Sequence, residues 1–261
     1  MNTVRFIARL DVKAPYLVKG VQLEGLRQLG DPHRFACDYY EQGIDEILYM
    51  DIVASLYDRS NILDLVEKTT QNVFVPLTVG GGLRTVADVA RALQSGADKV
   101  AINTAAIKRP ELITEVANHF GSQCMVVSIE AKRNTDSTGW QAYYDNGREP
   151  TGKDVVAWAK QAADLGAGEI LLTSVDREGL GKGMDVALVA AVTEQLSIPV
   201  IASGGVGRVE DVFTVIEQAH VQAVAMAHVL HYGKIELENL RRRAKERGIS
   251  VRQWQEINEA S

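Results

Sequence analysis

Two acidic residues, Asp11 and Glu130, each end a short apolar run, in the segments RFIARLDVK and CMVVSIEAK. If these runs are strands of one closed parallel barrel, their carboxyl ends face the same opening, where barrel enzymes carry their active sites. Two carboxylates opposed there suit acid–base catalysis, in which one accepts a proton while the other donates one. A lysine follows each acid two positions later, Lys13 and Lys132. A simpler interpretation is therefore a strand-end carboxylate that pairs with its lysine or caps a loop.

Two glycine-containing segments, 80–82 and 203–205, each follow an apolar run and precede a helical pattern. Glycine lets backbone N–H groups approach an anion, and the N-terminus of the following helix favours negative charge. Tight turns also require glycine, so one such segment is weak support, whereas two in equivalent places favour a substrate with a phosphate group at each end. The residues expected at the two anion sites are Gly81, Gly82, Asn103 and Thr104 for the first, and Gly204, Gly205, Ala227 and His228 for the second.

Four charged residues stand at the starts of apolar runs, at the end of the predicted barrel that usually serves stability. They are Arg5, Glu46, Lys99 and Glu169. A buried charge is costly unless it is paired, so two acids and two bases could form a neutral ring that closes this end. Two interpretations stay open: a structural plug, and a gate through which a small polar molecule enters the barrel axis.

Other polar residues give weaker signals. Asp51 ends the second apolar run and Asp176 lies just past the sixth, where either could orient substrate hydroxyl groups or be an ordinary loop acid. The histidines have no spacing to cysteines or carboxylates that would indicate a metal site. We therefore expect neither a metal nor another cofactor.

An internal repeat indicates how these residues are positioned. EILYMDIVASLY at 46–57 aligns with EILLTSVDREGL at 169–180, and VPLTVGGGLRTVADV at 75–89 aligns with IPVIASGGVGRVEDV at 198–212, with the same offset in both pairs. This repeat is much longer than the unit of about 20–50 residues in a solenoid. It indicates a duplicated half-domain of four strand–helix units.

Short β-branched runs alternate with amphipathic segments of about 12 residues, the pattern of a parallel sheet with crossover helices. Eight such units in two equivalent halves predict an α/β fold, a closed (β/α)8 TIM barrel with an internal half-barrel duplication. We expect one domain over residues 1–261, with half-barrels at about 1–120 and 121–250. The longest intervening segments, 12–30 and 131–153, occupy matching places and are expected to carry function. The predicted strands are 4–11, 46–52, 73–79, 98–103, 124–130, 168–174, 198–203 and 222–227, and helices are expected from Asp31–Pro32, Ser60, Thr85, Arg109–Pro110, Lys153–Asp154, Asp185, Arg208 and Ile235 onward.

Length, composition and charge limit the class of protein. A chain of 261 residues with 46% hydrophobic residues can bury one large core. The formal net charge of −6 argues against nucleic-acid binding, which requires a basic face. Two cysteines lie inside apolar-periodic segments, and no apolar run is long enough for a signal peptide or a membrane-spanning helix. We therefore expect a reduced, cytoplasmic protein that does not contact a membrane.

Several longer motifs carry a resemblance to a known family. They are LDVK and LVKG near the start, then PLTVGGGLR, ADKVAINTAA, FGSQC, GAGEILLTSVDREG, IPVIASGGVG and ERGISVR. Together they extend over nearly the whole chain, which resembles the cyclase (synthase) subunit of imidazole glycerol phosphate synthase, of histidine biosynthesis. The resemblance implies a glutaminase subunit, docked as a heterodimer at the N-terminal face of the barrel, that releases ammonia into the barrel axis.

At the opposite face, the resemblance implies, ammonia attacks a bisphosphorylated substrate, a phosphoribulosyl-formimino-aminoimidazole carboxamide nucleotide. The products are imidazole glycerol phosphate and aminoimidazole carboxamide ribonucleotide. In this comparison Asp11 matches the first catalytic aspartate, and the four charged residues at the strand starts match an ammonia gate. The other implied positions are Lys19, Gly82, Asn103, Thr104, Thr173, Gly179, Gly204 and Gly205 for substrate and phosphate binding, and Asp98 and Gln123 for contact with the glutaminase.

The chain departs from the family pattern around the predicted mouth. Glu130 stands where an aspartate is usual, and misplacing a catalytic group by about 1 Å can cost on the order of 100-fold. Arg9 adds a permanent charge to the first strand, which could lower the pKa of either carboxyl. Glu178, Leu180 and His228 replace the expected aspartate, threonine and serine. These departures leave two alternatives open: a paralogue that supplies or uses ammonia to amidate a surface-polysaccharide sugar, and a non-catalytic ammonia conduit that activates the glutaminase.

Overall fold

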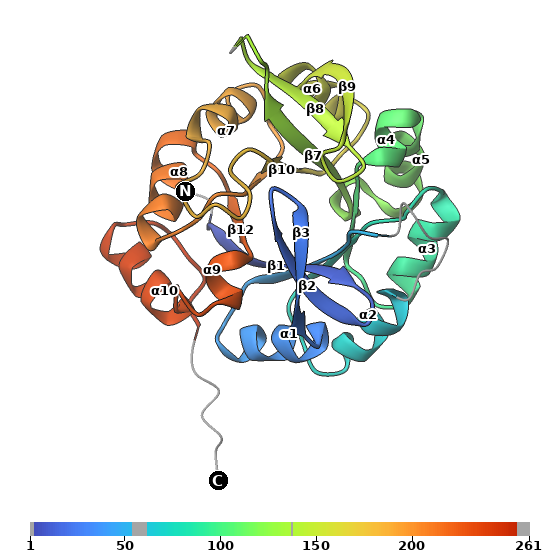
Figure 1. Ribbon diagram of the computed structural model, residues 1–261. Coiled ribbons are helices and arrows are strands. Elements are labelled where there is room, and N and C mark those ends of the chain that lie inside the picture. Colours follow the sequence, from blue (N-terminus) through green and yellow to red (C-terminus); the bar gives the residue numbers. More distant parts are fainter. Residues whose placement is uncertain (1–2, 54–61, 137, 255–261) are drawn as a thin grey trace.

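The computed structural model describes residues 3–53, 62–136 and 138–254, and Figure 1 shows a ring of helices around a central barrel of strands. Eight parallel strands pair in the order β10-β11-β12-β1-β4-β5-β6-β7, and β7 pairs with β10 to close the barrel. The predicted (β/α)8 barrel is therefore confirmed. The barrel strands are β1 (Arg5–Lys13), β4 (Glu46–Asp51), β5 (Leu77–Gly80), β6 (Lys99–Ile102), β7 (Met125–Arg133), β10 (Glu169–Ser174), β11 (Val200–Ser203) and β12 (Ala223–Met226).

The helices begin where the sequence offers caps. Asp31 accepts a hydrogen bond from the backbone N–H of His33 at the start of α1, and Thr85 and Asp88 form a capping box at the start of α3. The predicted helix start at Ser60 lies outside the described residues. No helix in the described ranges is both long and apolar enough to span a membrane. The helices are α1 (Pro32–Glu41), α2 (Ile62–Thr70), α3 (Val86–Gln94), α4 (Thr104–Lys108), α5 (Glu111–Phe120), α6 (Val155–Asp164), α7 (Val186–Thr193), α8 (Val209–Ala219), α9 (His228–His231) and α10 (Leu237–Glu246).

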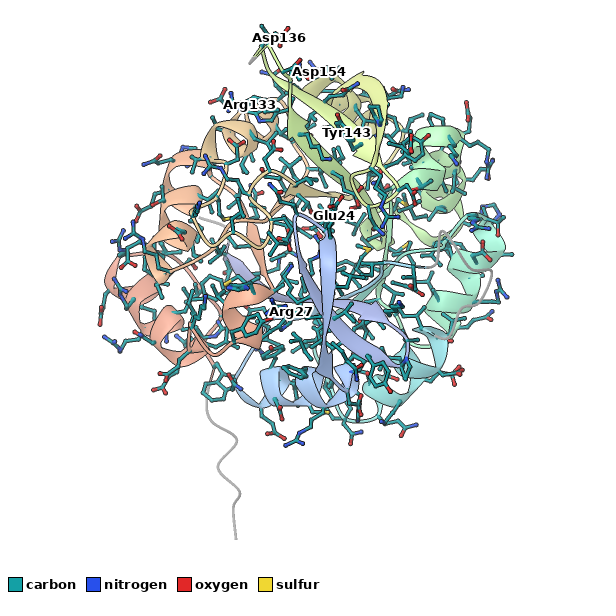
Figure 2. The ribbon with its side chains drawn as sticks, in the orientation of Figure 1. Glu24, Arg27, Arg133, Asp136, Tyr143 and Asp154 are labelled. Carbon is teal, nitrogen blue, oxygen red and sulfur yellow. The ribbon has the colours of Figure 1, made fainter. Side chains whose placement is uncertain are left out.

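The two longest intervening segments, 12–30 and 131–153, fold as β-hairpins. The first contains β2 (Tyr16–Val21) and β3 (Glu24–Gly30), and the second contains β8 (Trp140–Tyr144) and β9 (Glu149–Asp154). In each case the first hairpin strand pairs antiparallel with the barrel strand before it. Figure 2 shows Glu24 and Arg27 on the hairpin that lies over the middle of the ring, whereas the labelled residues of the second hairpin lie toward its rim.

This pairing also corrects several predicted strand ends. β1 and β7 continue to Lys13 and Arg133, past the predicted ends at 11 and 130, because β2 and β8 supply partners for their last residues. β5 begins at Leu77 rather than at residue 73, after Pro76, which cannot donate a ladder hydrogen bond. The short helices α4 and α9 follow β6 and β12 directly and were not predicted.

Side chains along each strand point alternately into the barrel and out toward the helices, so the inward side chains form layers inside the barrel. Every second residue of a strand points to the same face, so Arg5, Ile7, Arg9 and Asp11 of β1 all point inward at successive heights. Charged residues occupy both ends of the interior, and at the C-terminal end neutral polar residues such as Thr173 and Ser203 accompany them. A separate apolar cluster fills the middle, made of Ile7, Leu48, Ala101, Val126, Leu171, Ile201, Ala223 and Ala225. The C-terminal end of this stack forms the candidate site.

Candidate active site

Asp11 and Glu130 lie at the carboxyl end of the barrel, on strands that are four steps apart around the ring. Both side chains are buried. Neither forms an ion pair with Lys13 or Lys132 within the described ranges, and the Lys132 ammonium instead lies 4.7 Å from the centroid of the Tyr143 ring. Pairing with these lysines is therefore wrong, whereas Glu130 does accept a hydrogen bond from a loop backbone, that of Gly147, and also lines the first cavity.

Asp11 lies between two cations. Arg9 donates a hydrogen bond of 2.9 Å from Nε to Oδ1, and the Lys19 ammonium is 4.0 Å from Oδ2. Burial works to raise the pKa of Asp11, but the charges of Arg9 and Lys19 outweigh it, so the pKa is lowered from its usual value. Asp11 is therefore ionised at neutral pH and can accept a proton.

Glu130 has a backbone group rather than a cation as its closest partner. The N–H of Gly147 donates a hydrogen bond of 2.7 Å to Oε2. Burial raises the pKa of Glu130 to about 7, although the Gly147 N–H and the charge of Arg9 act in the opposite direction. The carboxyl can thus hold a proton at neutral pH. A pair of acids whose pKa values are driven apart in this way is suited to acid and base roles.

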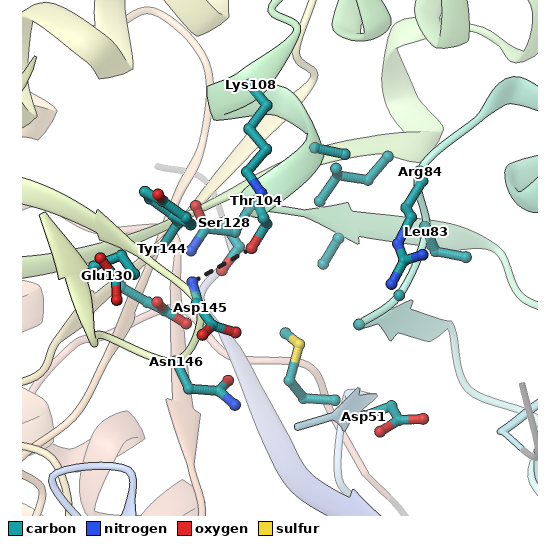
Figure 3. A pocket seen from close by; sticks show the side chains of 18 of the residues that line it. Asp51, Leu83, Arg84, Thr104, Lys108, Ser128, Glu130, Tyr144, Asp145 and Asn146 are labelled. Atoms are coloured by element: carbon teal, nitrogen blue, oxygen red, sulfur yellow. Dashed lines mark hydrogen bonds between the residues drawn. The ribbon is translucent and has the colours of Figure 1, made fainter. Parts of the chain in front are cut away.

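The first predicted anion site opens into a cavity of about 590 Å³ beside Glu130 (Figure 3). Gly81 has a φ of +94°, and a Cβ there would lie 2.1 Å from the carbonyl oxygen of Asp51, so this close turn requires glycine. The Oδ1 atom of Asn103 is buried without a hydrogen-bond partner among the described residues, so it can accept one from a ligand. The basic residues Arg84, Lys108 and Arg109 also line this cavity. Arg109 forms an ion pair of 2.5 Å with Glu115, and the Lys108 ammonium lies 5.3 Å from the centroid of the Tyr144 ring.

The second predicted anion site is nearly filled by protein. Its cavity has a volume of about 10 Å³ and is lined by Gly179, Gly204, Gly205, Ala227 and His228 together with Arg9 and Glu178. Glu178 forms a buried ion pair with Lys19 of the first hairpin. The backbone N–H of Gln22 also donates a hydrogen bond of 2.9 Å to the carbonyl of Glu178. The first hairpin is thus docked over this half of the mouth.

The remaining predicted substrate residues lie in different environments. Thr173 accepts a hydrogen bond of 3.0 Å from Arg9, and Asp51 lines the first cavity and accepts one of 3.0 Å from the Val53 N–H. Asp176 accepts a hydrogen bond of 2.8 Å from the Arg133 N–H, which ties it to the end of β7. Within the described ranges, no three His, Cys, Asp or Glu side chains are arranged to hold a metal ion.

The four charged residues at the other end form one connected ring. Arg5 donates to Glu46 at 2.5 Å and to Glu169, and Lys99 lies 3.3 Å from Glu46 and 3.1 Å from Glu169. Each acid therefore contacts both bases, which compensates the cost of burying the charges. The side chains of the two acids are almost fully buried, whereas about a fifth of each basic side chain is exposed.

Two further predicted residues lie next to this ring. Asp98 accepts a hydrogen bond of 2.8 Å from the Leu77 N–H, and the side chain of Gln123 donates one of 3.3 Å to the carbonyl of Phe120. Asp98 directly precedes β6 and Gln123 lies just before β7. Both therefore share the N-terminal end of the barrel with the charged ring.

The comparisons with known proteins agree with this arrangement. Residues 5–236 match the family described as histidine biosynthesis protein. The chain belongs to this family. A relative from Legionella pneumophila, imidazole glycerol phosphate synthase subunit HisF, is 58% identical over 211 residues, which make up 81% of this chain and 99% of the relative. The family inferred from the sequence motifs is therefore confirmed.

Several residues of the site were not predicted from the sequence. Tyr144, Asp145 and Asn146 of the second hairpin line the first cavity, and Asp145 donates its backbone N–H to the Thr104 hydroxyl at 3.4 Å. Figure 3 shows these residues with Glu130 on one side of the cavity and Arg84 on the other. The unusual length of segment 131–153 was the one signal for this contribution.

Proposed function

We propose that the chain, as a single barrel domain, is the cyclase subunit of an imidazole glycerol phosphate synthase. It uses ammonia to convert the phosphoribulosyl-formimino-aminoimidazole carboxamide nucleotide to imidazole glycerol phosphate and aminoimidazole carboxamide ribonucleotide. The observation that carries this proposal is the pair Asp11 and Glu130, opposed across the mouth with pKa values shifted in opposite directions. Family membership and the relative from Legionella pneumophila support the same reaction.

The two carboxyl groups divide the proton transfers of this reaction. Asp11, held ionised by Arg9 and Lys19, accepts the proton that the attacking nitrogen loses as it bonds to carbon. Glu130, held protonated by burial, donates its proton to the group that leaves. Burial of both side chains strengthens these electrostatic effects, because little water competes with the fixed partners.

Substrate binding relies on the two glycine-lined sites. The first cavity takes one phosphate, held by the backbone at Gly81 and Gly82 and by Asn103 and Thr104, with Asp51 beside it. The smaller second site takes the other phosphate once its side chains move apart. The residues proposed for this second half are Lys19, Thr173, Asp176, Gly179, Gly204, Gly205, Ala227 and His228.

Ammonia enters from the opposite end of the barrel. A glutaminase subunit docks at the N-terminal face, where Asp98 and Gln123 contact it, and forms a heterodimer with this chain. The ring of Arg5, Glu46, Lys99 and Glu169 acts as the gate to the barrel axis. A connected ring with no net charge supports this role, since a small polar molecule can replace one of its contacts without leaving a charge unpaired.

A direct test supplies nitrogen without the partner. The purified chain is mixed with the bisphosphorylated nucleotide and excess ammonium salt, and turnover is followed by ultraviolet absorbance. The proposal expects turnover that is abolished by Asp11→Asn and by Glu130→Gln. If the unaltered chain gives no turnover but still stimulates a glutaminase subunit, the cyclase assignment is contradicted.

A further inference from the structure

Lys234 follows the short helix α9 and contacts a residue of the second anion site. Its ammonium lies 2.8 Å from Nε2 of His228, and His228 lines the small cavity of that site. The Lys234 side chain is otherwise exposed, and within the described ranges it forms no ion pair with a carboxylate. No acid in the part of the chain that the structure describes therefore neutralises this charge.

The contact with Lys234 fixes the protonation of the His228 ring. An ammonium group can only donate hydrogen bonds, so Nε2 must accept this one, and a neutral ring that accepts at Nε2 carries its proton on Nδ1. Burial, followed by the charges of Lys234 and Lys19, lowers the pKa of His228. The negative charge of Glu178 acts in the opposite direction but is outweighed. The ring is therefore neutral at neutral pH and keeps an Nδ1 N–H, for which the described residues supply no acceptor.

The charged groups that line the second cavity, together with their partners, cancel one another. Arg9 lines the cavity and is bonded to Asp11. Glu178 lines it as well and is paired with Lys19. These two cations and two anions leave no net charge, whereas a phosphate monoester carries about −1.5 to −2 at pH 7. The glycine backbone of the site adds hydrogen-bond donors but no charge. Lys234 supplies the positive charge that this balance lacks.

We propose that His228 and Lys234 bind the second phosphate as a pair: the Nδ1 N–H of His228 donates to a phosphate oxygen, and the Lys234 ammonium on the other side of the ring offsets the phosphate charge. An ammonium that donates to Nε2 polarises the ring and makes its N–H a stronger donor. Lys234 thus acts through His228 and is a positioning residue. The inference deepens the proposed function and rests on it, because it takes the bisphosphorylated nucleotide as the substrate.

The test measures binding of inorganic phosphate to the whole chain by NMR, from the backbone N–H signals of both glycine-lined sites. Gly204 and Gly205 report on the second site, and Gly81 and Gly82 report on the first. In Lys234→Met we expect the phosphate Kd at the second site to rise about tenfold, the factor that corresponds to the loss of one hydrogen bond to a charged group. The Kd at the first site should not change. Lys234→Arg retains the cation and should restore most of the affinity.

A double-mutant cycle tests whether the two residues act together. His228→Ser removes the ring that connects the ammonium to the phosphate, so Lys234→Met should have a much smaller effect in that background than in the original chain. The control for net charge is Lys245→Met, which removes an exposed cation from α10 and should leave both phosphate Kd values unchanged.

Turnover with the bisphosphorylated nucleotide and ammonium salt gives a second readout. Lys234→Met should raise KM about tenfold and leave kcat nearly unchanged, because the pair holds a phosphate that does not react and so binds the substrate and the transition state equally. A purely structural role of Lys234 would not confine the loss to KM and to one of the two phosphate sites.

An unchanged phosphate Kd at the second site in Lys234→Met would overturn the pair, and so would an equal effect of this substitution in the His228→Ser background. Absence of phosphate binding at Gly204 and Gly205 in the unaltered chain would overturn it as well. If phosphate binding there depends on Lys234 but the nucleotide is not turned over, the pair stands as an anion site and the proposed function is contradicted.

Discussion

Asp11 and Glu130 are both carboxyl groups near the carboxyl ends of opposed strands. Their surroundings nevertheless shift their pKa values in opposite directions. Asp11 has a guanidinium at 2.9 Å and an ammonium at 4.0 Å. Glu130 has a backbone N–H at 2.7 Å as its closest partner. Burial raises the pKa of a carboxyl in both places, and adjacent cations reverse that effect only at Asp11. The nearest partner, rather than depth in the barrel, thus sets which acid carries a proton.

The two β-hairpins supply these different partners. The hairpin after β1 carries Lys19, whose ammonium faces Asp11 and Glu178. The hairpin after β7 carries Gly147, just past the end of β8, and its N–H binds Glu130. The two halves therefore place a hairpin in the same position, and both partners lower a carboxyl pKa. The charge of Lys19 helps to outweigh burial at Asp11, whereas the Gly147 N–H does not outweigh burial at Glu130.

Asp11→Asn should have the largest effect, because an amide cannot accept the proton and leaves Arg9 and Lys19 facing a neutral group. We expect kcat with ammonium salt to fall by about 1,000-fold or more. Steady-state rates from ultraviolet absorbance measure this, and the substrate Kd of the variant serves as the control for binding. A variant that retains a tenth of the original kcat would show that Asp11 is not the base.

Glu130→Asp tests whether the longer side chain is matched to its hairpin. The shorter acid withdraws from the Gly147 N–H, which lies 2.7 Å from the Glu130 carboxyl. We expect kcat to fall by about 10-fold to 100-fold, less than in Glu130→Gln, which has no proton to donate. Equal or higher activity in Glu130→Asp would mean that the position of this carboxyl is not critical.

Glu130 should also make stability depend on pH. Below about pH 4.5 its carboxyl is protonated in both the folded and the unfolded chain, and between 4.5 and about 7 only the unfolded chain loses the proton. Stability from this residue is therefore complete below pH 4.5 and is lost as the pH rises toward 7. Glu130→Gln removes this dependence, so relative to the original chain it should gain up to about 3 kcal/mol between pH 4.5 and 8.

Urea denaturation of both chains across this pH range measures the difference in the free energy of unfolding. The control is Glu149→Gln, which alters an exposed acid of the same hairpin and should show no such trend. A difference between Glu130→Gln and the original chain that stays constant with pH would contradict a raised pKa.

Lys13→Met and Lys132→Met should have the smallest effects. Neither lysine forms an ion pair with Asp11 or Glu130 within the described ranges, and Lys132 instead lies over the Tyr143 ring. We expect each variant to change kcat by less than about twofold, in the range of ordinary surface substitutions. A loss of tenfold in Lys132→Met would restore the interpretation in which that lysine serves Glu130.

The barrel and the heights of its functional side chains were predictable from the sequence. Strand periodicity and the internal repeat place Asp11 and Glu130 near the carboxyl ends of barrel strands and Arg5 and Glu169 at strand starts, and both signals are present in the sequence itself. The hairpins were missed because β3 is largely exposed and lacks the apolar alternation of a core strand.

The electrostatic environment of the site was harder to predict. Arg9 was recognised as a charge near the mouth, but its bond to Thr173 joins residues 164 positions apart. The partner of Glu130 is a backbone N–H, which no side-chain motif reveals. The lowered pKa of Asp11 follows from such cation contacts and the raised pKa of Glu130 follows from burial, so both required the folded chain.

Glu130 retains a proton in a substantial fraction of molecules at neutral pH, whereas Asp11 in the same site is ionised. The most direct measurement is a pH titration of the side-chain carboxyl carbons by NMR in protein labelled at Asp and Glu, with Asp11→Asn and Glu130→Gln spectra assigning the two signals. We expect the Glu130 signal to titrate at about pH 7 and the Asp11 signal below the usual range for aspartate. A Glu130 signal that titrates near pH 4.5, or an Asp11 signal that titrates above it, would contradict the division into acid and base.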